Sequence, residues 1–365
     1  MKDHQAQFER GRGSRGGRTP RRLLAVLSAA LLSVGIAACG DDDDDAGDGG
    51  DGGEASISSF AIVTPEEGND YGWNQQAVEA SETVASDMGI DVEVADNAGY
   101  EDISPILREL ATGGAELVIA QASGYNTTAP EVAAQTGVPM VVWDNPEATE
   151  AGLVADAGTA SQEGAYLAGV LAAETTKANK LGIVISADDV NWNKQAGGFI
   201  AGARSVSPDV EIELAQIGQA GYADTAGGKR VTEAVIANGA DVIFGMGDGS
   251  SFGMIQAVEN ADGVQFIDVI GDKTEVDDQG ILLSSVLWNF EGVIQGAIDD
   301  IGAGTFGEEP YELDLENGGI SLLQTDQIDD QTWSTIEDTR KQIIDGEIDV
   351  PLTEEKSEVQ DLIEG

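Results

Sequence analysis

From Ile57 onward, short apolar runs alternate with longer segments in which apolar residues recur every three or four positions. Runs such as 60–63 predict buried strands, because they are continuous, short and bounded by polar turns. The periodic segments predict amphipathic helices that bury one face. In this first half the pattern predicts strands at 60–63, 90–94, 117–120 and 139–143, and helices at 74–88, 103–112, 129–135 and 161–176.

The same rhythm restarts after the helix predicted at 161–176. The second half predicts strands at 181–185, 210–215, 241–244, 265–270, 281–287 and 319–323, and helices at 193–206, 225–238, 251–260, 290–301 and 332–345. Strands that alternate with helices form parallel sheets covered on both faces. Each run is too short for a closed barrel, so we expect two doubly wound α/β domains whose strand ends face one cleft.

The chain before Ile57 follows no such pattern. Residues 39–56 are rich in Gly and Asp and contain no apolar residue that could anchor a core, so we expect an extended, disordered tether. A calcium site is an alternative reading of its carboxylates. Before it, a basic region precedes an apolar run at 23–38 that is too short for a membrane helix and is typical of an export signal.

Ile36-Ala37-Ala38-Cys39 resembles a bacterial lipobox. By that resemblance, residues 1–38 are a signal peptide and Cys39 is the lipidated first residue of a protein held at the outer face of the cell membrane. An ordinary signal peptide with an incidental cysteine is the alternative. Arg21-Arg22 is only a weak twin-arginine signal.

Charge and chemistry narrow the function further. The chain has 18 Lys and Arg against 67 Asp and Glu, a net charge of −49 that repels nucleic acid and anionic membranes and suits a high-salt habitat. Its single histidine, His4, lies in the predicted leader, and its single cysteine is Cys39. The mature protein therefore lacks the groups for Ser-His-Asp or cysteine catalysis, disulfides and histidine zinc sites. We expect no enzyme activity, cofactor or metal.

Acids, amides, aromatics and glycine pairs gather in the loops that follow the predicted strands. Aromatic rings stack on flat rings, carboxylates accept hydrogen bonds, and glycines let backbone approach a ligand. The set suits a neutral, polar, partly planar small molecule, although each residue alone could be a turn former or helix cap. The candidate binding residues are Asp70, Trp73, Asn74, Gly124, Tyr125, Asp144, Trp192, Tyr222, Gly247, Asp248, Asp272 and Trp288.

An ordered set of motifs between about residues 60 and 323 resembles the basic membrane protein family of solute-binding lipoproteins, which includes purine nucleoside receptors of ABC importers. The segments that carry the resemblance are Asp70-Tyr71-Gly72-Trp73-Asn74-Gln75, Gln162-Glu163-Gly164-Ala165-Tyr166-Leu167-Ala168-Gly169, Gly198-Phe199-Ile200-Ala201-Gly202-Ala203-Arg204, Gly239-Ala240-Asp241-Val242-Ile243 and Gly271-Asp272. The resemblance implies the type I periplasmic binding protein fold, two Rossmann-like lobes joined by a three-stranded hinge. Lobe I would comprise 57–155 and 283–310, and lobe II 156–282 and 311–365, with crossovers near Asp156, Leu283 and Tyr311.

The resemblance also implies roles for single residues. Trp73 and Tyr222 would stack on a base, Asp144 would hold that base, and Asp272 would hold the ribose. The family has a lysine after the late strand where this chain has Trp288, and Lys273 is a possible substitute. A tryptophan adds stacking area and removes three donors, so a free base, a flavin-like ring or another polar metabolite remains an alternative ligand.

The resemblance implies a monomer that closes around its ligand and docks on an ABC permease with its ATPase, without nucleic acid as a partner. A receptor that signals to a membrane sensor is one alternative. A surface hydrolase that uses Asp144 and Asp272 as paired carboxylates is another, which the missing histidine disfavours.

Overall fold

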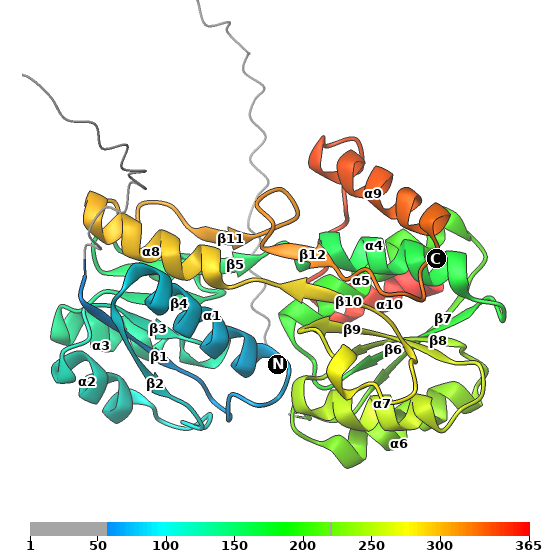
Figure 1. The fold of residues 1–365 in the computed structure, drawn as a ribbon, viewed down its shortest axis with the longest axis horizontal. Coiled ribbons are helices and arrows are strands. Elements are labelled where there is room, and N and C mark those ends of the chain that lie inside the picture. The colour runs from blue at the N-terminus through cyan, green and yellow to red at the C-terminus, as the bar shows by residue number, and fades with distance from the viewer. Residues whose placement is uncertain (1–56, 220) are drawn as a thin grey trace, which may run out of the picture. The chain divides into compact units, whose positions relative to one another are not determined.

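The computed structural model describes residues 57–219 and 221–365. The predicted signal peptide, the lipidation site Cys39 and the tether at 39–56 lie outside the described residues. Two six-stranded sheets form the centres of two lobes (Figure 1). The predicted α/β class and the two doubly wound lobes are confirmed.

The first sheet has the strand order β11-β5-β4-β3-β1-β2, and all of its strand pairs are parallel. Its members come mostly from the first half of the chain, and β11 joins from near the end. The bounds are β1 Ser59–Val63, β2 Asp91–Ala95, β3 Val118–Ala120, β4 Met140–Trp143, β5 Val154–Thr159 and β11 Tyr311–Leu313.

The second sheet has the order β12-β10-β9-β8-β6-β7 and is parallel except for the edge strand β12, which runs antiparallel to β10. The strand order reverses between β3 and β1 in the first sheet and between β8 and β6 in the second, which creates the switch point where ligands bind in open α/β sheets. The bounds are β6 Lys180–Ile185, β7 Glu211–Gln216, β8 Val242–Met246, β9 Gln265–Ile270, β10 Leu282–Trp288 and β12 Ile320–Leu322.

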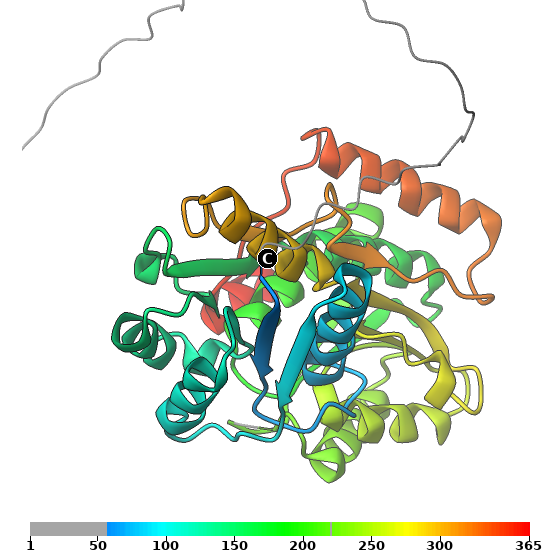
Figure 2. The ribbon, with the colours of Figure 1, turned by 60° about the vertical axis from the view of Figure 1, so that its left-hand side comes forward.

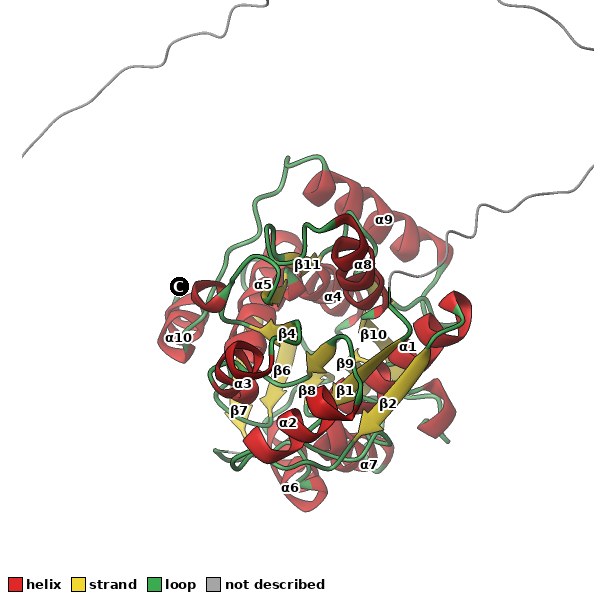
Figure 3. Cartoon of the chain, turned by 90° about the vertical axis from the view of Figure 1, so that its left-hand side faces the viewer, coloured by secondary structure: helices red, strands yellow, loops and turns green. Residues whose placement is uncertain are grey.

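Helices cover both faces of each sheet (Figure 3). In the first lobe α8 lies beside α1 although it comes from late in the chain (Figure 2), and α2 packs on α3. In the second lobe α4 packs on α5, and α6 packs on α7; α9 and α10 lie outside α4 and α5. The bounds are α1 Trp73–Met88, α2 Ser104–Gly113, α3 Thr128–Thr136, α4 Ser161–Thr175, α5 Val190–Val206, α6 Thr225–Ala237, α7 Ser251–Glu259, α8 Glu291–Ala303, α9 Asp330–Ile344 and α10 Lys356–Glu364.

The glycines of two family motifs explain how closely α4 and α5 approach. A Cβ on Gly198 would lie 2.1 Å from the carbonyl oxygen of Gln162, and a Cβ on Gly202 would lie 2.0 Å from that of Tyr166. Any side chain at these positions would force the helices apart. These motifs therefore serve the packing of the second lobe beneath the cleft.

The lobes are joined where the chain passes from one sheet to the other. The first crossing follows Thr159, the second follows Trp288, and the third lies between Leu313 and Ile320. Each lies a few residues beyond the boundary expected near Asp156, Leu283 or Tyr311. The reason is that β5 and β11 belong to the first sheet, whereas all of β10 belongs to the second.

The predicted strands and helices all occur, with ends that shift by a few residues. The sequence pattern missed β5, β11 and α10. No helix among the described residues is long and apolar enough to span a membrane.

Candidate ligand-binding cleft

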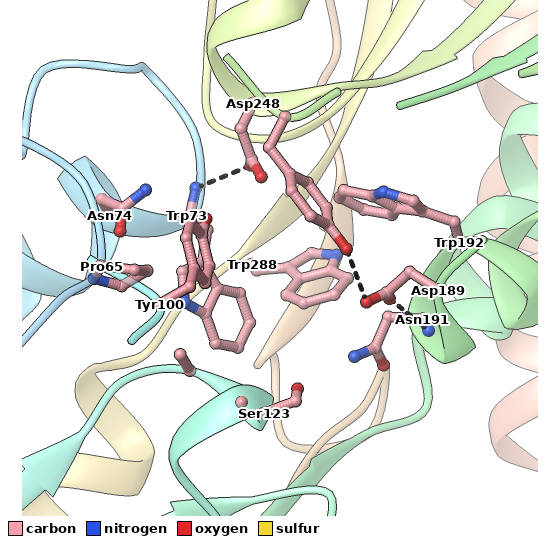
Figure 4. Close-up of a pocket in the computed structure, with 13 residues that line it drawn as sticks. Pro65, Trp73, Asn74, Tyr100, Ser123, Asp189, Asn191, Trp192, Asp248 and Trp288 are labelled. Carbon is pink, nitrogen blue, oxygen red and sulfur yellow. Dashed lines mark hydrogen bonds between the residues drawn. The ribbon is translucent and has the colours of Figure 1, made fainter. Parts of the chain in front are cut away.

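A cavity of about 100 Å³ lies between the lobes at the carboxyl ends of the strands (Figure 4). The sequence predicted seven of its lining residues, namely Trp73, Asn74, Gly124, Trp192, Tyr222, Asp248 and Trp288. Sequence reasoning missed the other six, which are Pro65, Tyr100, Ala122, Ser123, Asp189 and Asn191. Both lobes contribute residues to its wall.

The loop before α1 is ordered by the buried carboxylate of Asp70. Its oxygens accept hydrogen bonds from the backbone N–H groups of Gly72 at 2.9 Å and Gln75 at 3.0 Å, and from Nδ2 of Asn74 at 2.6 Å. An acid at a helix start satisfies free N–H groups and complements the helix dipole. Asp70 therefore positions Trp73 and Asn74, and it does not itself line the cavity.

Asp248 reaches across the cleft from the second lobe. It begins the short 3₁₀ turn Asp248–Ser250 after β8, and its Oδ1 accepts a hydrogen bond from the backbone N–H of Trp73 at 3.1 Å. A Cβ on Gly72 would lie 2.6 Å from that oxygen, so only glycine leaves room for the approach. Burial raises the pKa of Asp248 well above its ordinary value, and the nearby Asp70 adds to the shift.

A second carboxylate, Asp189, lies at the start of α5. It accepts a hydrogen bond from the backbone N–H of Asn191 at 2.9 Å and another from the Tyr222 hydroxyl at 3.1 Å. Loss of water around it raises the pKa of Asp189, although these bonds oppose the shift. Asp189 thus holds the side chain of Tyr222, which lines the cavity.

Aromatic rings form much of the wall. Trp73 packs edge-on against Trp143, Trp288 and Phe290, with ring centroids 5.0, 5.9 and 5.2 Å away, and its Nε1 donates to the carbonyl of Gln121 at 2.9 Å. Such packing holds the indole in one orientation.

Tyr100 of the first lobe stacks on Tyr222 of the second, with centroids 6.3 Å apart and planes 23° from parallel. This pair joins the lobes at the cavity wall.

Five of the predicted residues do not line the cavity: Asp70, Tyr125, Asp144, Gly247 and Asp272. Tyr125 is buried in the core of the first lobe, where its hydroxyl donates to the carbonyl of Gly99. Asp144 lies beside the cavity and accepts hydrogen bonds from Ser123 Oγ at 2.5 Å and from Asn191 Nδ2 at 3.1 Å. The second of these bonds joins the two lobes.

The remaining two face elsewhere. The carbonyl of Gly247 accepts a hydrogen bond from Ser250, which closes the turn after β8. Asp272 is exposed, and its carboxylate accepts the backbone N–H of Thr274 at 2.8 Å in a local turn. It lines a different surface pocket, so the cavity does not bring Asp144 and Asp272 together as a catalytic pair.

Lys273, considered a substitute for the family lysine, is also turned away from the cavity. Its side chain is 1% exposed, and its Nζ lies 3.0 Å from Oδ2 of the buried Asp268. Lys273 therefore balances a charge beneath the cleft.

The polar groups of the wall define what it can bind. Asp189 and Asp248 are its charged residues, and no Lys, Arg or His is among the lining residues that the structure describes. Bringing an anion beside these carboxylates would be unfavourable. The described residues also hold no cluster of His, Cys, Asp and Glu suited to a metal ion. The wall suits an uncharged, flat molecule with hydrogen-bond donors.

Of the residues missed, Ser123 follows the strand predicted at 117–120, and Asp189 and Asn191 follow the strand predicted at 181–185, so all three come just after a predicted strand end. Tyr100 could have been found by the same rule, since it follows β2. Pro65 and Ala122 carry no polar group that could have marked them.

Known proteins resemble this chain over nearly its whole length. An ABC transporter nucleoside-binding protein, BmpA, from Lactococcus lactis is 27% identical over 360 residues, which cover 91% of this chain and 99% of the relative.

Two solved structures share the fold. A solute-binding protein of an ABC transporter system from Aeropyrum pernix has a TM-score of 0.73 at 20% identity and covers 84% of this chain and 96% of its own. Another solute-binding protein, from Conexibacter woesei, has a TM-score of 0.67 at 21% identity, and the match covers 80% of this chain and 98% of its own.

The sequence profile of one family, described as "ABC transporter substrate-binding protein PnrA-like", matches residues 57–354. That match spans both lobes and every residue that lines the cavity. The chain therefore belongs to the Bmp family of ABC transporter substrate-binding proteins, as its motifs had indicated.

Proposed function

We propose that this protein captures a neutral purine nucleoside, or a free purine base, in the cavity between its lobes and delivers it to an ABC permease. The observation that carries the proposal is the composition of the wall, in which aromatic rings from both lobes lie beside two carboxylates, the buried Asp248 and the half-buried Asp189. Rings stack on a heterocycle, and carboxylates accept its N–H or O–H groups. The nucleoside-binding relative from Lactococcus lactis supports the same ligand class.

In this proposal the roles expected for single residues shift with their positions. Trp73 and Tyr222 remain the candidates for packing on the base, since both line the cavity. Asp248 takes the role given to Asp272, because its carboxylate is in the wall and that of Asp272 is not. Asp144 acts beside the ligand by holding Ser123 and Asn191 in place.

A free base is the second candidate, and Trp288 favours it. A lysine offers three donors to ribose hydroxyls, whereas an indole offers one donor and a flat apolar face. A free base has no ribose hydroxyls to accept the lysine's hydrogen bonds, but it can stack on the flat face of the Trp288 indole.

We further propose that Cys39 is lipidated and that residues 39–56 tether the lobes to the outer face of the membrane. The lipobox resemblance and the acidic, glycine-rich sequence support this. Mass spectrometry of the protein extracted from its native membrane tests it. A diacylglyceryl group on Cys39 is the expected result, and an unmodified Cys39 or cleavage elsewhere would contradict it.

A thermal-shift screen tests the ligand class. The purified protein is heated in high salt with purine nucleosides, purine bases, flavins or sugars. A ligand at a hundred times its Kd adds about 2.7 kcal/mol of stability and raises Tm visibly. We expect a shift with a purine nucleoside or base and none with nucleoside monophosphates, because their phosphate would face Asp189 and Asp248. A shift with sugars alone would reject the proposal.

A further inference from the structure

Trp288 carries a polar group that has no partner among the residues that the structure describes. It is the last residue of β10, lines the cavity and is only 3% exposed. Its Nε1–H is fully buried and has no hydrogen-bond partner among the described residues. In Figure 4 the nitrogen lies on the side of the ring away from Ser123.

The other side-chain donors of the wall are all engaged within the protein. The Nε1 of Trp192 donates to Ser186 Oγ at 2.9 Å, and that of Trp73 donates to the carbonyl of Gln121. The remaining bonds run from Asn74 to Asp70, Asn191 to Asp144, Ser123 to Asp144, Tyr100 to Glu66 and Tyr222 to Asp189. Within the described part of the wall, Nε1 of Trp288 is thus the side-chain donor atom that makes no hydrogen bond.

A buried donor without an acceptor destabilises a protein, and native proteins keep few of them. A donor on a residue that lines a ligand cavity is satisfied when the bound ligand brings an acceptor within reach of it. We propose that Trp288 donates its Nε1–H to an acceptor atom of the bound ligand and so determines specificity. This rests on the proposed function only in taking the cavity as the ligand site.

The inference completes a recognition pattern for the ligand. Asp189 and Asp248 accept hydrogen bonds, so the ligand turns donors toward them. Trp288 requires an acceptor, a ring nitrogen or a carbonyl oxygen, at a third point. Purines carry acceptors and donors on the edges of one flat ring, whereas a purely apolar ring would leave the indole N–H unsatisfied.

A double-mutant cycle between protein and ligand tests the hydrogen bond. Trp288→Phe removes the N–H and keeps a ring. Wild type and variant are titrated by calorimetry with adenosine, 3-deazaadenosine and 7-deazaadenosine, in which CH replaces one ring nitrogen. We expect Trp288→Phe to weaken adenosine about tenfold. One of the two deaza analogues should bind wild type as weakly as adenosine binds Trp288→Phe. The affinity of that analogue should be the same for Trp288→Phe as for wild type. Equal affinity of wild type and variant for adenosine would overturn the inference.

The ligand-free protein gives a second readout that needs no purine. Trp288→Phe removes an unsatisfied donor, whereas the control Trp192→Phe breaks the bond to Ser186. Both replace a buried indole that lines the cavity. We expect Tm to fall less in Trp288→Phe than in Trp192→Phe. A fall as large as the control's would mean that Nε1 has a partner, which overturns the inference. Failure of adenosine and the other purines to bind wild type would instead reject the proposed function.

Discussion

The backbone N–H of Trp73, at the start of α1 in the first lobe, donates to Oδ1 of Asp248 in the second lobe at 3.1 Å. A carboxylate of one lobe thereby caps a helix of the other, and the bond can exist only when the lobes are closed. Both residues also line the cavity. One of the contacts between the lobes is therefore part of the proposed ligand site, and we expect closure of the lobes to be linked to ligand binding.

Gly72→Ala tests this contact without removing a polar group. The new Cβ would lie 2.6 Å from Oδ1 of Asp248 and 3.1 Å from its Cα, so the lobes could not close fully. Since apparent affinity falls with the fraction of closed protein, we expect binding to weaken about tenfold or more. Calorimetric titration measures it. The control Gly249→Ala places its Cβ at an ordinary 3.5 Å from Ala223, and it should bind as wild type does. Equal affinities of the two variants would show that closure does not need this approach.

Closure should depend on pH through Asp248. Burial and the nearby Asp70 and Glu66 raise its pKa, while the hydrogen bond from the Trp73 backbone and the charge of Lys273 oppose the shift. A raised pKa means that the closed state favours the protonated acid. This contribution to closure is fully present below the ordinary pKa of aspartate and is lost as the pH rises through the raised value.

Small-angle scattering of the ligand-free protein over that pH range measures the change. We expect opening as the pH rises in wild type and a smaller change in Asp248→Asn, which stays neutral. The exposed Asp272→Asn is the matched control and should follow wild type. Asp189 and Asp268 also have raised pKa values and remain in every variant. The contribution of Asp248 is therefore measured as the difference between wild type and Asp248→Asn. Identical profiles of wild type and Asp248→Asn would contradict the assignment.

Tyr100 should matter for binding and not for folding. Its side chain is 56% exposed, yet its ring stacks on Tyr222 across the cleft. We expect Tyr100→Ala to change the free energy of unfolding by less than about 0.5 kcal/mol. Affinity should fall because an interlobe contact is lost, and Tyr100→Phe, which keeps the ring, should restore it. If Tyr100→Phe bound as weakly as Tyr100→Ala, the hydroxyl bond to Glu66 would be the important contact.

The ion pair beneath the cleft should contribute to stability. Nζ of Lys273 lies 3.0 Å from Oδ2 of Asp268, and both side chains are fully buried. Lys273→Met leaves the acid without a counter-charge, which costs about 3–5 kcal/mol for buried pairs. Denaturation by urea measures it, and adding Asp268→Asn should recover part of the loss. The exposed pair of Lys341 and Asp345 is the control, where Lys341→Met should have little effect. A small loss for Lys273→Met would mean that Asp268 is buried as the neutral acid.

Much of the architecture was predictable because it follows from local pattern. Apolar runs and helical periodicity predicted nearly every strand and helix. Because predicted strands alternate with predicted helices, the sequence also predicted parallel sheets. The elements that were missed lack those signals. β5 contains Asp156 and small residues, β11 has only three residues, and α10 is strongly polar. Since β5 and β11 carry the chain between sheets, missing them also moved the expected crossovers.

The sequence predicted where the site lies better than it predicted which side chains line it. Parallel strands bring their carboxyl ends together, so the loops that form the wall could be chosen from the sequence. Which side chain of a loop turns inward depends on backbone detail. Asp248 has a φ of 46° and faces the cavity, whereas Asp272 closes a local turn and faces solvent. Asp70 lies in the loop before α1 and Asn74 in the first turn of α1; the two side chains are hydrogen-bonded, and only Asn74 lines the wall.

The central claim is that closing the two lobes forms the binding site of a neutral purine. Isothermal titration calorimetry of the purified protein with adenosine, guanosine, inosine and their free bases tests it most directly. We predict that at least one of these compounds binds with one-to-one stoichiometry and that Asp248→Ala weakens it at least tenfold. Absence of binding by all six, or binding that Asp248→Ala leaves unchanged, would contradict the claim.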